Sequence, residues 1–199
     1  MLSGAVGLSV VALAVCCLCI VFSGVIKYHR GRRRLRQIGT SGILACLSHV
    51  DIEAFRQLLD PMEEAFLRQS HSRNDFCEMQ KDRIESALGY LKKMANNAIA
   101  LQALGYRNLR SPNDTQRFLA RRLIDRAVPV RMFTFVGIWV LRIWRVLPIR
   151  RLLLVSPSLA DLKDLMAELL PAYEQLKETA LELTVLTEPE FGAELLQNL

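Results

Sequence analysis

Apolar and small residues fill the first 26 positions of the chain, and none of these positions carries a charge. An apolar helix needs about 20 residues to cross the roughly 30 Å hydrocarbon layer of a bilayer. The run is long enough, and the glycines within it are common in helices that span membranes. It therefore predicts a transmembrane anchor over residues 1–26.

A dense group of basic residues follows the apolar run and predicts its orientation. No Lys or Arg precedes the run, whereas six lie directly after it: Lys27, Arg30, Arg32, Arg33, Arg34 and Arg36. Because loops rich in Lys and Arg stay on the cytoplasmic side, we expect the N-terminus outside and the rest of the chain in the cytoplasm. The bacterial inner membrane is the expected location, and an organelle outer membrane is the alternative. A cleaved signal peptide would have a basic segment before a shorter apolar core, and the chain has neither.

Helical periodicity dominates the chain after a flexible joint that ends near residue 50. Apolar residues recur at helical spacing over 51–59, and Asp60 followed by Pro61 predicts the start of a second helix. The longest stripe runs over residues 75–104, where apolar side chains recur every seven residues. Gly105 directly follows this stripe and is the expected helix stop.

Two helices separated by Pro129 are expected over residues 112–127 and 130–147. The second is apolar on nearly every side. Its uncharged core, residues 132–141, is about half as long as a crossing requires, and Arg142 and Arg145 follow. A second crossing is therefore disfavoured.

Two interpretations of the 130–147 helix remain open. In the first, the helix lies in the plane of the membrane, with its tryptophans at headgroup level and its arginines on anionic lipid. In the second, it is the central helix of a bundle, and its arginines pair with acidic residues near the C-terminus. The candidate lipid or partner contacts are Arg131, Trp139, Arg142, Trp144, Arg145, Arg150 and Arg151.

Charged residues are sorted along the chain, so the net charge of +6 hides two opposite segments. Residues 107–151 carry eleven arginines and two aspartates, a charge of +9, whereas residues 152–199 carry a charge of −7. We expect these segments to face each other, within one molecule or between two.

A last long helix is predicted from Ser158 onwards, with Ser158 as its N-terminal cap. Its leucines recur every seven residues, at Leu162, Leu169, Leu176 and Leu183. This spacing suits a bundle helix or a coiled-coil seam between two copies. Because Pro171 removes a backbone hydrogen bond and clashes with the preceding turn, we favour a bundle helix that is kinked or split there.

Motifs for nucleophilic catalysis, phosphate binding and zinc binding are missing from the sequence. Glu78, Asp82 and Glu85 share one helix side and form the only candidate acidic site, although a solvated face is the simpler interpretation. The basic segment lacks the interleaved aromatic residues of a nucleic-acid interface. We expect no cofactor, no metal and no nucleic acid. Enzyme activity is disfavoured, with a helical-bundle enzyme or ligand receptor as the alternative.

These patterns predict an all-α protein with three parts: a single transmembrane helix (1–26), a basic collar and joint (27–50), and a cytosolic antiparallel helical bundle (51–199). We interpret it as a non-catalytic scaffold or adaptor with a membrane-proximal amphipathic helix. A homo-oligomeric coiled-coil organiser is the alternative. The expected partners are the anionic headgroups of the bilayer and either another protein or a second copy of the chain.

Overall fold

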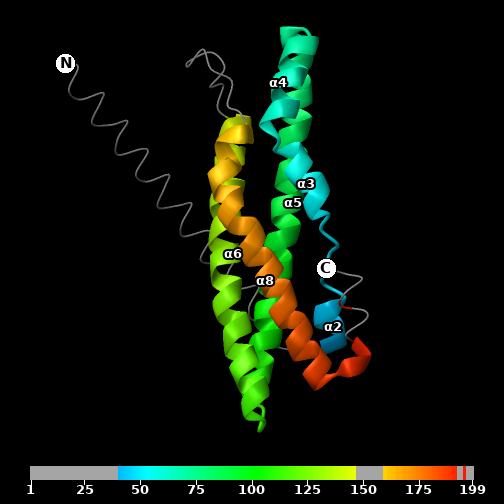
Figure 1. Ribbon diagram of the computed structural model, residues 1–199, viewed down its shortest axis with the longest axis vertical. Helices are drawn as coiled ribbons and strands as arrows, with labels where there is room; N and C mark the ends of the chain where they lie inside the picture. Colours follow the sequence, from blue (N-terminus) through cyan, green and yellow to red (C-terminus); the bar gives the residue numbers. More distant parts are fainter. Residues whose placement is uncertain (1–39, 147–158, 192–194, 196–199) are drawn as a thin grey trace, which may run out of the picture. The chain divides into compact units, whose positions relative to one another are not determined.

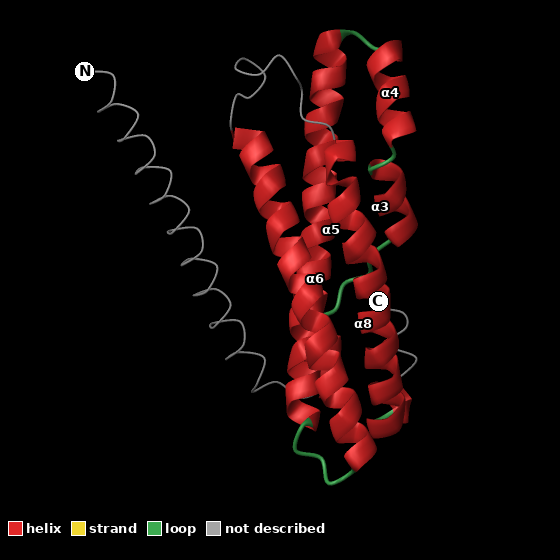
Figure 2. Ribbon diagram, turned by 60° about the vertical axis from the view of Figure 1, so that its left-hand side comes forward, coloured by secondary structure: helices red, strands yellow, loops and turns green. Residues whose placement is uncertain are grey.

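The computed structural model describes residues 40–146, 159–191 and 195. Every regular element in these ranges is a helix (Figure 2), which confirms the predicted all-α class. The chain divides into two compact units, Met1–Ile38 and Gly39–Leu199, and the described residues belong to the second. The predicted anchor and basic collar lie outside the described residues, as do Arg150 and Arg151.

Three short helices open the described part of the chain: α2 (Thr40–Leu44), α3 (Ile52–Leu58) and α4 (Pro61–Ser70). Asp51 caps α3 by accepting a hydrogen bond from the backbone N–H of Ala54 at 2.9 Å. Asp60 caps α4 in the same way through the N–H of Met62, also at 2.9 Å. The predicted start of a helix at Asp60 and Pro61 is thus confirmed.

Three long helices follow: α5 (Arg73–Asn108), α6 (Asp114–Val146) and α8 (Lys163–Thr187). Single 3₁₀ turns, η1 (Leu159–Leu162) and η2 (Pro189–Phe191), flank α8. Figure 1 shows α6 beside both α5 and α8, and these two pairs make the main contacts between elements. Position 105 of α5 faces Ile124 of α6, whereas Leu91 faces position 137, so α5 and α6 run in opposite directions.

Gly105 lies where α5 and α6 approach each other, and this explains why α5 does not end there. The predicted stop at Gly105 is wrong, because α5 continues to Asn108. A Cβ atom at position 105 would lie 2.8 Å from Cγ1 of Ile124 and 3.0 Å from the carbonyl oxygen of Ala120. The glycine serves close contact between two helices and not a left-handed turn.

Pro129 lies inside α6 without ending it, so the predicted break between two helices is also wrong. A proline inside a helix removes one backbone hydrogen bond and strains the preceding turn. Ala127 and Val130, on either side of it, are fully buried in the core. Packing of these neighbours holds together a helix that the local sequence would break. Helix α8 likewise runs through Pro171.

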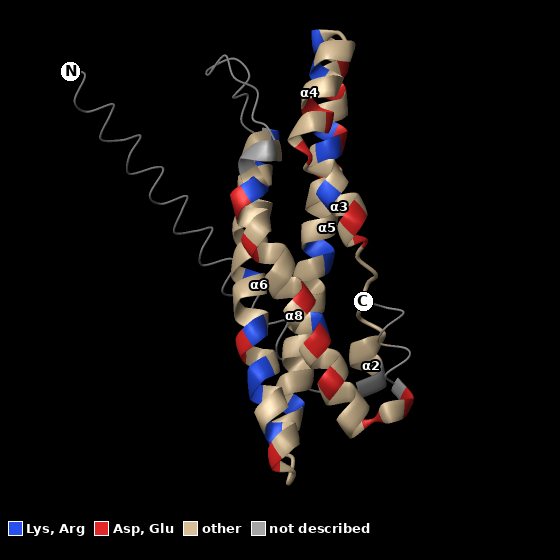
Figure 3. Ribbon diagram, in the orientation of Figure 1, with Lys and Arg blue, Asp and Glu red and all other residues tan. Residues whose placement is uncertain are grey.

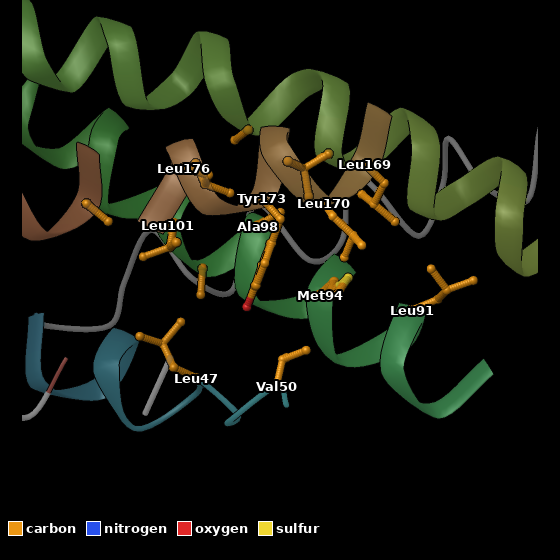
Figure 4. Packing of buried hydrophobic residues seen from close by; sticks show 14 of the residues in the cluster. Leu47, Val50, Leu91, Met94, Ala98, Leu101, Leu169, Leu170, Tyr173 and Leu176 are labelled. Atoms are coloured by element: carbon orange, nitrogen blue, oxygen red, sulfur yellow. The ribbon is translucent and has the colours of Figure 1, made fainter. Parts of the chain in front are cut away.

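The core is formed mainly by side chains from α5, α6 and α8 (Figure 4), and α2, α3 and the segment that joins them add further buried side chains. The four leucines of the seven-residue series, Leu162, Leu169, Leu176 and Leu183, are all buried in it. A seam between two copies would need these same side chains. Packing within one chain therefore accounts for their spacing.

A buried polar cluster joins three parts of the fold. The side-chain amide of Asn97 on α5 donates to the hydroxyl of Tyr173 at 2.7 Å and to the carbonyl of Ser48 at 2.8 Å. Its oxygen accepts from the N–H of Ser48 at 2.9 Å. Figure 4 shows Tyr173 reaching from α8 towards α5. Burial raises the pKa of Tyr173 to about 12, and the hydrogen bond from Asn97 lowers it in part.

Substituting Gly105 tests the close contact between α5 and α6. We expect Gly105→Ala to lower the free energy of unfolding by about 1–3 kcal/mol, because the new methyl group meets the backbone of Ala120. Gly89→Ala is the matched control, since a Cβ there meets nothing within 4 Å. The control should gain up to about 1 kcal/mol from the better helix propensity of alanine. Thermal unfolding followed by circular dichroism measures both changes, and equal melting temperatures for the two variants would contradict the assignment.

Removing the Tyr173 hydroxyl tests the polar cluster. Tyr173→Phe leaves one Asn97 donor without its partner in a buried position, and we expect a loss of about 1–3 kcal/mol near neutral pH. Tyr90→Phe is the control, because the Tyr90 ring packs on Phe55 at 5.2 Å and its hydroxyl makes no hydrogen bond within the described part of the chain. Chemical denaturation of both variants measures the difference.

Alkaline pH gives an independent measurement of the same residue. A phenol whose pKa is raised from 10.0 to about 12 in the folded state keeps its full stabilising contribution below pH 10 and loses it as the pH rises towards 12. The wild-type protein should therefore lose more stability over this interval than Tyr173→Phe does. Parallel pH profiles for the two proteins would show that Tyr173 is not buried.

Candidate functional site

Helix α6 has an inner side that belongs to the core. Val130, Thr134 and Leu141 are fully buried there. A Cβ atom on Gly137 would lie 2.9 Å from Cδ1 of Leu91 on α5 and 3.4 Å from Cδ2 of Leu165 on α8. Both neighbouring helices therefore approach α6 closely along this side.

The outer side of the same stretch is apolar; five of its side chains are exposed to solvent, and Trp139 is half-buried. We call this set the apolar stripe; its members are Val128, Met132, Phe135, Val136, Trp139 and Ile143. Val128, Met132, Phe135, Trp139 and Ile143 follow at spacings of three or four, and Val136 widens the row, so all six share one face of the helix. Met132 is 63% exposed, and the Phe135 and Trp139 rings meet edge to face with centroids 6.1 Å apart. Several large apolar side chains in a row on one face are unusual for a surface that stays in water.

One of the predicted arginine contacts lies beside the apolar stripe. The guanidinium carbon of Arg142 is 5.5 Å from the centroid of the Trp139 ring, and Arg142 itself is exposed. A cation over an indole face is attracted by the ring electrons and leaves its outer N–H groups available. Trp139 and Arg142 thus form the polar edge of the stripe.

The other predicted contacts in this helix face the neighbouring elements. Arg131 donates to the side-chain oxygen of Gln102 on α5. Arg145 forms an ion pair with Glu85 on α5, with 3.2 Å between Nη2 and Oε2. Trp144 is half-buried and packs against the core. The structure therefore brings Trp139 and Arg142 together and directs Arg131, Trp144 and Arg145 elsewhere.

The two oppositely charged segments do lie side by side, because α6 packs against α8. Arg126 joins them by donating to the carbonyl oxygen of Gln175 at 2.8 Å and to the hydroxyl of Thr179. Arg145, which the bundle interpretation paired with an acidic residue near the C-terminus, pairs with Glu85 instead. Hydrogen bonding to carbonyl and hydroxyl oxygens contributes to this contact, which charge counting alone could not predict.

Helix α6 is long and apolar enough to cross a membrane, as judged by length and composition alone. It is the only such helix among the residues that the structure describes. Of its most apolar 18-residue window, only 28% is buried against the rest of the chain. This helix is longer than the sequence predicted, because Pro129 was expected to divide it into two helices.

The predicted acidic site takes a different form in the structure. Glu78, Asp82 and Glu85 are exposed on α5, and Glu85 is engaged with Arg145. Over residues 40–146 and 159–191, no three His, Cys, Asp or Glu side chains are grouped so that they could hold a metal ion. Two exposed carboxylates and one ion pair give the surface charge without assembling a ligand set.

Apart from Trp139, the side chains of the apolar stripe were not included among the predicted contacts, although their helical spacing could have identified them. Burying a half-exposed Met, Phe or Ile removes apolar surface from water and yields roughly 1 kcal/mol per side chain. The stripe can therefore bind an apolar surface, and it carries no nucleophile or general base. No protein-family model matches this chain, and neither the curated proteins nor the solved structures contain a match to it.

Proposed function

We propose that the protein is a membrane-anchored, non-catalytic scaffold or adaptor. Residues 1–26 span the membrane once, the basic collar holds the following residues on the cytoplasmic side, and the rest forms an antiparallel helical bundle. Helix α6 lies on the cytoplasmic surface of the same bilayer through its apolar stripe. The observation that carries this proposal is the row of exposed apolar side chains on a helix whose other side is packed.

Docking in the membrane plane fits the surroundings of α6 better than a crossing does. Lys92 and Lys93 on α5 and Glu168 on α8 are exposed on helices that pack against α6. A crossing would either separate α6 from both helices or carry these charges into hydrocarbon. Each charge at mid-bilayer costs some 2.5–3.5 kcal/mol. An in-plane position buries the apolar stripe and leaves the charges in water.

The anchor makes a modest docking surface sufficient. A tether holds the domain close to the membrane and raises its effective concentration there, so the second contact needs little affinity of its own. Six partly exposed apolar side chains at roughly 1 kcal/mol each supply that affinity. Trp139 and Arg142 at the edge suit the headgroup layer, where indoles and arginines are commonly found.

The two tryptophans of the chain, both in α6, provide the test. Trp144→Phe leaves Trp139 as the sole fluorophore, and Trp139→Phe leaves Trp144. In vesicles that contain brominated phosphatidylcholine, we expect strong quenching of Trp139 and weak quenching of Trp144 in the full-length protein, because Trp144 packs against the core. Strong quenching of both would indicate a crossing, and quenching of neither would overturn the docking proposal.

A pair of substitutions in the apolar stripe tests its role directly. Met132→Gln with Phe135→Gln, in the Trp144→Phe background, should reduce the docked-to-undocked ratio roughly tenfold or more, since two apolar contacts are lost. Because Phe135 is only 41% exposed, its substitution also removes some buried apolar surface, and we expect the pair to lower the free energy of unfolding by about 1 kcal/mol. Met62→Gln with Phe66→Gln is the matched control, because these exposed residues lie on α4. Equal loss of Trp139 quenching in both variants would show that the stripe has no special role.

A further inference from the structure

The face of α6 that carries the apolar stripe becomes charged towards the N-terminal end of the helix. Arg121, Asp125, Val128 and Met132 follow at three- or four-residue spacing, so they lie along one line of the helix. Residues 114–125 are charged along this line, whereas residues 128–143 are apolar. Figure 3 shows basic residues gathered along the part of α6 nearest its start.

Arginine side chains predominate in this charged half. Arg117, Arg121 and Arg122 are exposed, as are Asp114 and Asp125. Arg117 pairs with Asp114 one turn away. The side chains of Arg121 and Arg122 form no ion pair or hydrogen bond within the described part of the chain. Their charges are therefore available to a partner with anionic groups.

Nearby residues add both positive charge and exposed apolar surface to the N-terminal end of α6. Arg107 and Arg110, at the end of α5 and in the turn before α6, are exposed as well and add positive charge. Phe118 is 63% exposed between Arg117 and Arg121, which places an apolar ring among the guanidinium groups. A surface with positive charge around an apolar group suits the boundary between lipid headgroups and acyl chains.

We propose that α6 is a two-part lipid-binding helix, in which Arg121 and Arg122 bind the phosphate headgroups of anionic phospholipids while the apolar stripe enters the acyl boundary. The inference rests on the proposed function and adds the residues of α6 that select anionic lipid. Eleven residues separate Arg121 from Met132, about 16 Å along the helix. Both halves therefore contact the same leaflet at once. Guanidinium groups bind phosphate with two parallel hydrogen bonds, which suits them to this role.

Vesicles of two compositions test the proposal on the full-length Trp144→Phe protein. One contains phosphatidylcholine alone, and in the other a third of the lipid is phosphatidylglycerol; both carry brominated chains. We expect stronger Trp139 quenching in the anionic vesicles. Arg121→Gln with Arg122→Gln should lower the docked-to-undocked ratio there by up to about 30-fold and leave quenching in neutral vesicles unchanged. Arg121→Lys with Arg122→Lys should restore most of the effect, because the charge is kept.

Arg73→Gln with Lys81→Gln is the matched control, since both side chains are exposed near the start of α5. Like Arg121 and Arg122, they form no ion pair or hydrogen bond within the described part of the chain. This control should leave the preference for anionic vesicles intact. High salt, which shortens the screening length to about 3 Å at 1 M, should remove that preference in the parent protein. Circular dichroism melting curves that match the parent will show that all the variants are folded.

The outcomes separate the two proposals. Equal quenching of Trp139 in neutral and anionic vesicles would overturn the lipid preference and leave the docking of α6 in place. An equal loss in the Arg121/Arg122 and Arg73/Lys81 variants would overturn the assignment of the preference to α6. Absence of Trp139 quenching in both vesicle types would overturn the docking of α6 on lipid. A second copy of the chain that covered the apolar stripe would give this result.

Discussion

Packing of α6 against both α5 and α8 is the constraint on which the rest of the structure depends. Gly105 and Gly137 allow these helices to approach one another so closely that an added methyl group would meet a neighbouring atom at 3.0 Å or less. Interiors packed to this density do not tolerate an extra methylene without cost. The position of the inner side of α6 is therefore fixed, and its outer side is held in one orientation towards the surroundings.

The packing of the inner side of α6 also determines which of its side chains face outward. Arg131 and Arg145 are engaged with α5, and Trp144 packs on the core, so these residues position the helix. Trp139 and Arg142 face outward on the same helix. A sequence that is apolar on nearly every side thus combines two uses, one in the protein interior and one at its surface. Partial exposure of the most apolar segment follows directly from this arrangement.

Local signals in the sequence were sufficient for one helix start, at Asp60 and Pro61. They were insufficient for the start of α8, which begins at Lys163 without a side-chain cap, and for the helix ends. Asp60 with Pro61 predicts a start because capping involves neighbouring residues only. Gly105 and Pro129 have the features of ends, yet contacts with distant residues override them. The same limit applies to the candidate site. Helical spacing places arginines on a side of α6, but only the structure reveals that Glu85 and Gln102 lie within their reach.

The residues on the inner side of α6 stabilise the fold, whereas those of the apolar stripe on its outer side do so much less. An exposed side chain such as Met132, which is 63% exposed, contributes little to folding, because most of its apolar surface stays in water when the chain folds. Fold stability therefore does not require such side chains to be apolar, and polar residues would serve the folded chain equally well in water. The proposed docking of this face on an apolar surface would account for the row of six apolar positions. The predicted anchor, about 100 residues upstream in the sequence, would keep a bilayer within reach of that face.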